Sequence, residues 1–179
     1  MEFSVVGRSY PSKTGKSKIT GHTRYINDLY LPGMLYGAAL RSSHVHARIL
    51  EINTEKAEQL PGVRAVLTGT MVPQNIGIYT GDKPPLARNK VRHFGEIVAL
   101  VAADTPAQAT AACGLISVKY EPLPSVLTPL EALRDGAPLI HPEMAEYRHA
   151  PFIHPEPGTN IANRTKIRKG DAEIGRAHV

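Results

Sequence analysis

The stretch GEIVALVAADTPAQATAACGLISVKY, residues 95–120, carries the strongest structural signals in this chain. It opens with nearly unbroken apolar sequence up to Ala103, which is typical of a strand buried on both faces. A helix from Thr105 to about Cys113 and a second strand over 115–120 should follow. The stretch therefore predicts one strand–helix–strand unit.

The ends of the predicted helix are marked by local signals. The Thr105 hydroxyl can accept a hydrogen bond from the first turn, and Pro106 stands where its missing N–H costs nothing. Gln108 would complete a capping box, and Gly114 would end the helix.

A similar unit lies upstream, over residues 47–68. A strand at about 47–52 leads to Thr54, which can cap a short helix that Pro61-Gly62 would end. A strand over 63–68 completes the unit. The two units predict an α/β (α+β) fold, a mixed sheet with helices packed on it. If the paired strands are parallel and adjacent, each crossover should be right-handed.

The remaining segments follow from composition. Residues 34–40 predict a further strand, residues 71–90 a long surface loop with one short strand at most, and residues 127–133 a helical turn or two. The predicted organisation is an N-terminal arm (1–17), a compact domain (18–142), a Pro-rich connector (143–172) and a tail (173–179). Because the tail resembles a translated sequencing adapter, we take it as a candidate non-native tail.

Charge and composition narrow the class of protein. The net charge is +5, but aromatic residues make up only 6% and do not interleave with the basic stretches Lys13–Arg24 and Arg164–Lys169. With no nucleic-acid-binding motif, a solvated basic surface or one facing an acidic partner is favoured over a nucleic-acid partner. No apolar run is long enough to span a membrane, and no secretory signal is visible. A single cysteine, Cys113, fits a reducing compartment, and we expect a cytoplasmic protein.

The search for catalytic motifs finds none that holds. Gly15-Lys16-Ser17 resembles the end of a phosphate-binding loop, but Tyr10 stands where that motif needs glycine. No G-x-G-x-x-G motif follows a strand. Cys113 has no activating base nearby in the sequence, so a small buried thiol is the favoured interpretation.

Two polar groups remain as candidates. His44 and His46 would share one face of an extended segment. The two imidazoles could form half of a metal site, but such a site needs a third ligand, and the sequence indicates none. Arg92 and Glu96 form an acid–base cluster that is more typical of a structural ion pair than of catalysis. Together with Arg41, these residues are the candidate domain interface; no catalytic, cofactor-binding or metal-binding residue is predicted in this chain.

Six motifs in order resemble one known family. They are Lys18–Asp28, Leu31–Gly37, Leu40–Ala47, Pro61–Gly69, Pro85–Glu96 and Val118–Pro124. Their order and spacing resemble the N-terminal a/b hammerhead domain of the xanthine dehydrogenase and aldehyde oxidase family. The resemblance covers residues 18–142 and extends more weakly to Asp171. Ser43 and Ile97 stand where the family commonly has proline.

The resemblance implies an activity for a larger protein. Large subunits of this family bind molybdopterin, hydroxylate aldehydes or N-heterocycles with oxygen from water, and pass electrons to iron–sulfur clusters on the same or a partner chain. A flavin (FAD) subunit is a further possible partner. The family's glycine motifs and catalytic glutamate lie downstream of the hammerhead. We therefore expect a connector toward an absent molybdopterin-binding domain, and a chain that is truncated and inactive alone.

Two alternatives stay open from the sequence. The chain could be a small non-catalytic subunit of a split molybdenum hydroxylase, or a stand-alone binding module. A downstream reading frame with glycine-rich cofactor motifs would favour a molybdenum hydroxylase over the stand-alone module. For a hammerhead separated from its subunit, exposed docking surface predicts marginal stability or self-association.

Overall fold

In the computed structural model, the residues described are 4–167 and 169–170, so the predicted tail 173–179 lies outside them. The chain divides into two units, Met1–Met34 and Leu35–Val179. The first unit contains helix α1 (Gly15–Ile19) and a 3₁₀ turn (Ile26–Asp28), and neither has a buried residue. No residue from 4 to 34 is buried, so the core that the structure describes belongs to the second unit.

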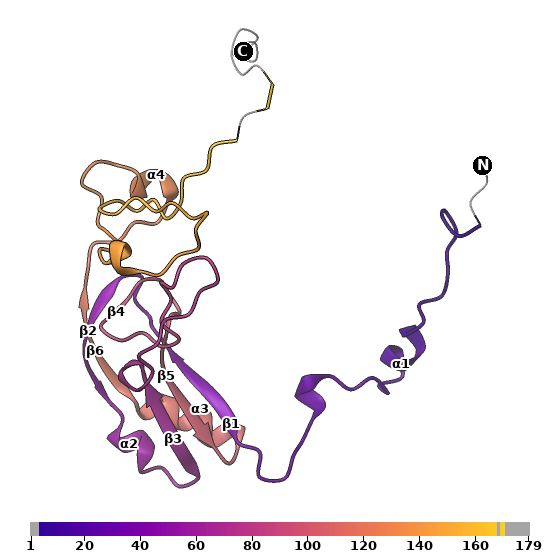
Figure 1. The fold of residues 1–179 in the computed structure, drawn as a ribbon. Helices are drawn as coiled ribbons and strands as arrows, with labels where there is room; N and C mark the ends of the chain where they lie inside the picture. The colour runs from indigo at the N-terminus through magenta and orange to yellow at the C-terminus, as the bar shows by residue number, and fades with distance from the viewer. Residues whose placement is uncertain (1–3, 168, 171–179) are drawn as a thin grey trace. The chain divides into compact units, whose positions relative to one another are not determined.

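Six strands of the second unit form two three-stranded sheets (Figure 1). One sheet has the order β1 (Tyr36–Arg41), β5 (Ile97–Ala103), β3 (Val63–Thr68). The other has the order β4 (Lys90–Val91), β2 (Ala47–Asn53), β6 (Ser117–Pro122). Every neighbouring pair is antiparallel.

Helices join and flank these strands. They are α2 (Glu55–Glu58), α3 (Pro106–Leu115) and α4 (Pro129–Ala132), with 3₁₀ turns at Gly69–Met71 and Met144–Glu146. Both predicted strand–helix–strand units are present, and the α/β class with helices packed on sheet is confirmed.

The pairing of the strands differs from the expectation. Within each unit the two strands lie in different sheets, and each pairs with a strand of the other unit: β3 with β5, and β2 with β6. The condition of adjacent parallel strands is therefore not met, and the right-handed crossovers that would follow from it do not arise. The reason is that an apolar pattern records how much of a strand is buried and carries no information about which strand lies beside it.

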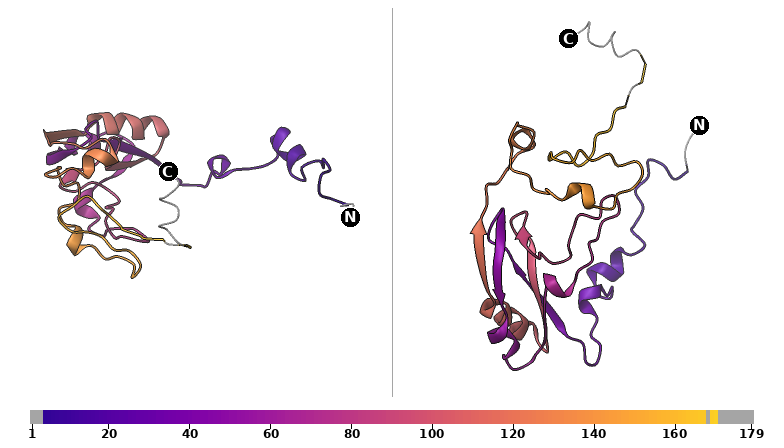
Figure 2. Two further views of the ribbon diagram at one scale, coloured as in Figure 1. Left: turned by 90° about the horizontal axis from the view of Figure 1, so that it is seen from above. Right: turned by 60° about the vertical axis from the view of Figure 1, so that its left-hand side comes forward.

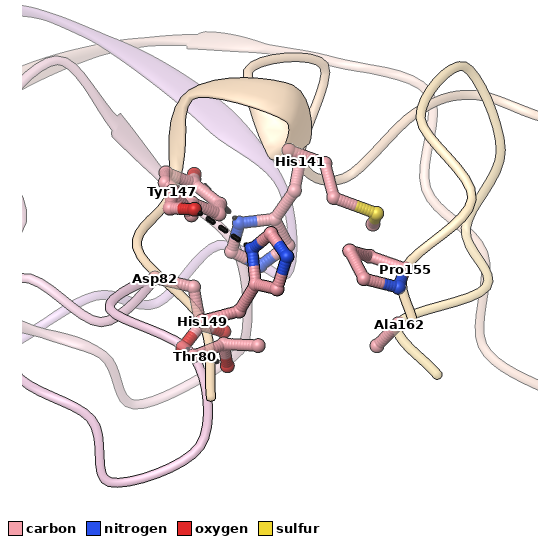
Figure 3. Close-up of a pocket in the computed structure, with 8 residues that line it drawn as sticks. Thr80, Asp82, His141, Tyr147, His149, Pro155 and Ala162 are labelled. Atoms are coloured by element: carbon pink, nitrogen blue, oxygen red, sulfur yellow. Dashed lines mark hydrogen bonds between the residues drawn. The ribbon is translucent and has the colours of Figure 1, made fainter. Parts of the chain in front are cut away.

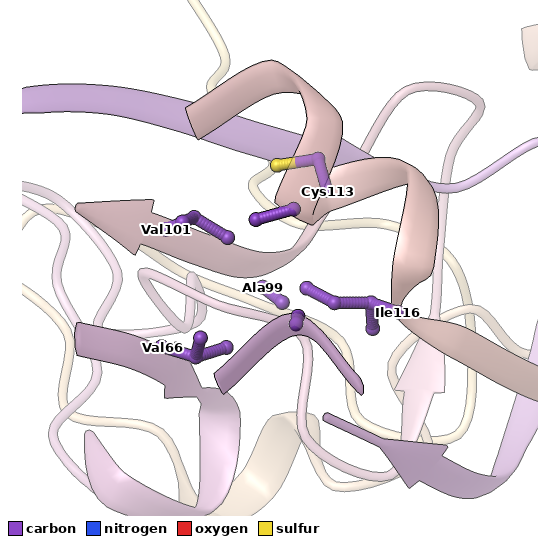
Figure 4. Packing of buried hydrophobic residues seen from close by; sticks show 7 residues of the cluster. Val66, Ala99, Val101, Cys113 and Ile116 are labelled. Atoms are coloured by element: carbon purple, nitrogen blue, oxygen red, sulfur yellow. The ribbon is translucent and has the colours of Figure 1, made fainter. Parts of the chain in front are cut away.

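Strand β5 shows how two-sided burial arises here. Ala99 and Val101 pack in one hydrophobic cluster with Cys113 and Ile116 around α3 (Figure 4), whereas Val98 packs in a second cluster against the other sheet. Cys113 is buried as predicted, and burial raises the pKa of its thiol, which stays protonated at neutral pH.

The caps of the helices are confirmed only in part. The Thr105 hydroxyl oxygen accepts a hydrogen bond from the backbone N–H of Gln108, as predicted. The Gln108 side chain does not close the capping box but donates to the Pro61 carbonyl at 3.1 Å. Thr54 does not cap α2, because its hydroxyl donates to the Glu58 carboxylate instead. The predicted stop at Gly114 is wrong by one residue, since α3 runs to Leu115.

Two stretches predicted as surface segments also contribute to the second unit. Leu86 and Ala87, near the end of the predicted loop 71–90, are fully buried. In the Pro-rich connector, Met144 is buried, and His149 forms a backbone bridge with Thr80. In Figures 1 and 2 the connector (orange and yellow) lies at the end of the sheets opposite α2 and α3. The connector is therefore packed on the domain where it is described.

Candidate functional site

Polar side chains gather where the connector meets the sheets. We call them the junction cluster. Its members are Asp82, Arg92, Glu96, His141, Glu143 and Tyr147. Arg92 directly follows β4 and Glu96 directly precedes β5, while Glu143 and Tyr147 flank the 3₁₀ turn at 144–146. The cluster therefore joins two parts of the chain that are distant in sequence.

Arg92 is the centre of the junction cluster. Its side chain is only 9% exposed and forms an ion pair with Glu143. Its backbone N–H donates to the carboxylate of Glu96, which is itself buried. Among the described residues, Arg92 Nε has no hydrogen-bond partner although it is buried. Burial and the positive charge of Arg92 lower the pKa of the neighbouring Lys90.

His141 and Tyr147 form the second half of the cluster. The His141 Nδ1 lies 2.9 Å from the Tyr147 hydroxyl. Burial lowers the pKa of His141, with the charge of Arg92 acting in the same direction. Burial also raises the pKa of Tyr147 to about 12. At neutral pH the tyrosine hydroxyl can therefore donate to a neutral imidazole.

The space beside His141 and Tyr147 is small. Figure 3 shows their side chains around a cavity of about 30 Å³, which can hold about one water molecule. Nothing of substrate size fits there, so the neutral histidine has no substrate proton within reach. The arrangement is suited to holding the connector against the domain rather than to acid–base catalysis.

A larger polar cavity of about 430 Å³ adjoins the cluster. Its wall contains Arg88 and Arg92, but three carboxylates, from Asp82, Glu143 and Glu146, outnumber them. Both arginines are also engaged within the chain: Arg92 pairs with Glu143, and Arg88 donates to the Pro73 carbonyl and to Asn75. With three carboxylates in its wall, the cavity is unfavourable for an anionic ligand.

The two histidines predicted as half a metal site have separate partners. His44 is half-buried and its ring centroid lies 4.7 Å from that of Tyr120. His46 is buried, and its Nδ1 lies 2.6 Å from the Pro124 carbonyl. Within the described ranges, no group of three metal-ligating side chains is close enough to hold an ion.

The other predicted interface residues vary in exposure. Arg41 is exposed and donates to the Gly95 carbonyl at 2.9 Å. Arg92 and Glu96, by contrast, are buried within the chain. The ion pair expected between them is not formed, because the Arg92 guanidinium pairs with Glu143 and, among the described residues, Glu96 accepts only the Arg92 backbone N–H. An interface role for this set stays a prediction, and Arg41 is its member most open to a partner.

Sequence reasoning missed the connector half of the junction cluster. Glu143 and Tyr147 lie in a Pro-rich stretch without helical or strand period, and 51 residues separate Glu143 from Arg92. No local spacing signals such a contact. The only hint in the sequence is a run of polar and aromatic side chains inside a segment otherwise typical of a linker.

Comparison with known proteins identifies the family. Residues 20–124 match the family model described as aldehyde oxidase and xanthine dehydrogenase, a/b hammerhead domain. The chain belongs to this family. The match covers more than half of the chain and ends just after β6, so the hammerhead contains both sheets.

Relatives of this hammerhead chain are much longer proteins. It is 40% identical to a probable xanthine dehydrogenase subunit of Bacillus subtilis, over 90% of this chain and 20% of that protein. It is 34% identical to the nicotinate dehydrogenase large molybdopterin subunit of Eubacterium barkeri, over 78% of this chain and 33% of the relative. The chain thus spans a third or less of these relatives.

A solved structure confirms the fold of the hammerhead chain. The crystal structure of a Cu,Mo-CO dehydrogenase matches with a TM-score of 0.70 and 38% identity. The match covers 75% of this chain and 18% of that one. In the described part of the hammerhead chain, no helix combines the length and apolar character that a membrane span requires.

The polar cavity at the junction cluster of the hammerhead chain does not fit a molybdopterin cofactor. That cofactor is anionic and needs converging donors, whereas the 430 Å³ cavity is lined by more carboxylates than arginines. The two buried nitrogens without partners among the described residues, His46 Nε2 and Arg92 Nε, are closed off from solvent, although Arg92 itself lies in the wall of that cavity. The junction cluster is therefore assigned no chemical step that involves the cofactor.

Proposed function

We propose that this chain is the hammerhead portion of the molybdopterin-binding large subunit of a molybdenum hydroxylase that acts on aldehydes or N-heterocycles. The observation that carries the proposal is the extent of the match to the Bacillus subtilis protein. It runs through 163 residues at 40% identity and covers 90% of this chain, more than the hammerhead model covers. Similarity of that length supports a shared role and not only a shared fold.

Within such a subunit, the role of this portion is structural. The junction cluster holds the connector against the end of the sheets, and the connector leads toward a molybdopterin-binding domain. The proposed organisation is an arm (1–17), a hammerhead domain (18–142), a connector (143–172) and a candidate non-native tail (173–179). Iron–sulfur clusters on the same or a partner chain, and a FAD subunit, would complete a cytoplasmic enzyme.

The proposal predicts that the chain is inactive alone. The test is to express and purify it, then to measure molybdenum by mass spectrometry and dye-linked oxidation of an aldehyde and a purine. A full-length relative prepared in the same way is the positive control. We expect neither metal nor turnover from the chain. Stoichiometric molybdenum in the isolated chain would overturn the proposal.

A further inference from the structure

A rigid tip projects from the loop that precedes β4. Its exposed residues are Ile78 and Tyr79, and Phe152 of the connector lies beside them. We call these three residues the aromatic tip. The sequence marks residues 71–90 as a long loop, a kind of segment that often faces a partner. The proposed function above uses none of the three.

Backbone hydrogen bonds hold the aromatic tip in one conformation. Ile76 and Lys83 exchange both backbone hydrogen bonds, at 2.8 and 3.2 Å. The Gly81 amide donates to the Arg148 carbonyl, and the Ala150 amide donates to the Tyr79 carbonyl at 2.8 Å. The loop is therefore pinned both to itself and to the connector.

Glycine is required at the turn of the tip. Gly77 has a φ of 151°, and a Cβ added there would lie 1.6 Å from the Thr80 carbonyl oxygen. Only glycine fits so close an approach of backbone to backbone. The turn is thus built to present the next two side chains outward.

The side chains of the tip are large, apolar and exposed. Ile78 is 90% exposed, Tyr79 is 59% and Phe152 is 61%. The two rings pack edge to face, with centroids 5.9 Å apart. Rigid exposed aromatic side chains lose little conformational freedom on binding, and such residues dominate the affinity of protein interfaces.

Charge beside the tip indicates what would cover it. A cavity of about 440 Å³ adjoins Ile78 and Tyr79, and Arg148 is the charged residue in its wall, which contains no carboxylate. Among the described residues, no acidic group forms an ion pair with Arg148. The nearby Asp82 accepts a hydrogen bond from Thr80 and belongs to the wall of the His141 cavity.

We propose that the aromatic tip and Arg148 form a docking site for a partner protein segment that carries an apolar side chain next to a carboxylate. The apolar side chain would pack on Tyr79 and Phe152. The carboxylate would take the two parallel donors of the Arg148 guanidinium. This site does not depend on the proposed molybdenum hydroxylase function, because its argument uses only the shape and charge of this surface.

The test is a binding titration on the whole chain. The probes are two fluorescein-labelled octapeptides. In the acidic peptide, apolar residues (phenylalanine or leucine) alternate with acidic residues (aspartate or glutamate). In the amide peptide, asparagine replaces each aspartate and glutamine replaces each glutamate. Anisotropy should show saturable binding of the acidic peptide and at least tenfold weaker binding of the amide peptide. Arg148→Gln and Phe152→Ser should each weaken the acidic peptide about tenfold.

Matched variants elsewhere separate docking from a general effect. Arg134→Gln and Leu130→Ser change an exposed arginine and an exposed leucine beyond the tip, and both should leave binding unchanged. The circular dichroism spectrum of each variant should match that of the native chain, which establishes that the variant is folded. The proposal fails if the two peptides bind equally, if no binding is seen at millimolar peptide, or if the control variants weaken it as much as the tip variants.

Discussion

Arg92 and Glu143 form a nearly buried ion pair that joins the end of β4 to the connector across 51 residues of sequence. The arginine side chain is 9% exposed and the glutamate side chain 30%. Removing one partner of such a pair leaves a charge buried without compensation, which costs more than the pair itself contributes.

The first prediction concerns the loss of the Glu143 charge. Glu143→Gln should lower the free energy of unfolding by about 2 kcal/mol, below the usual cost for a fully buried pair because Glu143 is partly exposed. Urea unfolding measures it. The matched control is Glu121→Gln, which breaks the exposed Arg48–Glu121 pair and should change stability by no more than about 0.5 kcal/mol. Equal effects of the two variants would show that the junction pair has no special role.

The second prediction is the pH dependence of the Glu143 contribution. Burial raises the pKa of Glu143, but its backbone hydrogen bond and the charge of Arg92 outweigh burial and leave the pKa lowered. A lowered carboxyl pKa gives stability that is present above the unfolded pKa, about 4.3, and is lost as pH falls through the folded value. The difference in urea midpoint between the native chain and Glu143→Gln should therefore be constant from pH 7 to about pH 5 and shrink below pH 4. A difference that grows in acid would contradict the sign.

The third prediction concerns the tyrosine of the junction cluster. Burial, with the charge of Glu143 acting in the same direction, raises the pKa of Tyr147 to about 12. Because the folded state favours the neutral hydroxyl, Tyr147 adds to the free energy of unfolding below the unfolded pKa of about 10. This contribution is lost as pH rises toward 12. An ultraviolet titration of phenolate absorbance should show Tyr147 ionising last, after Tyr120, whose pKa burial also raises, and after the remaining tyrosines. Tyr147→Phe should remove that late step and leave the earlier ones. If the variant lost an early step instead, the raised pKa would not belong to Tyr147.

The fourth prediction compares two glycines. Gly62 has a φ of 87°, and a Cβ there would lie 2.2 Å from the Gln108 side chain, so Gly62→Ala should destabilise the chain by about 1–2 kcal/mol. Gly114 lies inside α3 with open space around its Cβ position, so Gly114→Ala should stabilise the chain by about 0.5–1 kcal/mol. Thermal unfolding measured on both variants checks the opposite signs.

The fifth prediction compares two threonines at helix starts. The Thr105 side chain caps α3, so Thr105→Ala should cost about 1 kcal/mol of unfolding free energy. Thr54 precedes α2 without accepting a cap hydrogen bond, so Thr54→Ala should cost clearly less. Similar losses at both sites in urea unfolding would argue that the hydroxyl at position 105 does not act as a cap.

Much of the local structure could be predicted from the sequence because its causes are local. The buried strand 97–103 follows from its apolar run, and the start of α3 follows from Thr105 and Pro106. Where two local interactions compete, the prediction failed: the Thr54 hydroxyl reaches Glu58, and Gln108 reaches Pro61 rather than closing its capping box. Of the junction cluster, the sequence analysis named Arg92 and Glu96, but as part of a candidate domain interface that stays a prediction, and it missed Glu143 and Tyr147.

The sequence by itself determined the approximate extent of the main strands and of helices α2, α3 and α4, which strand is buried on both faces, and, through six ordered motifs, the family. These properties depend on neighbours along the chain or on similarity to relatives. Only the tertiary structure decided that each strand–helix–strand unit is divided between two antiparallel sheets, that Arg92 pairs with Glu143, and that Tyr79 lies beside Phe152. Such contacts join residues far apart in the chain, and their free energy depends on burial and geometry that no local pattern of residues encodes.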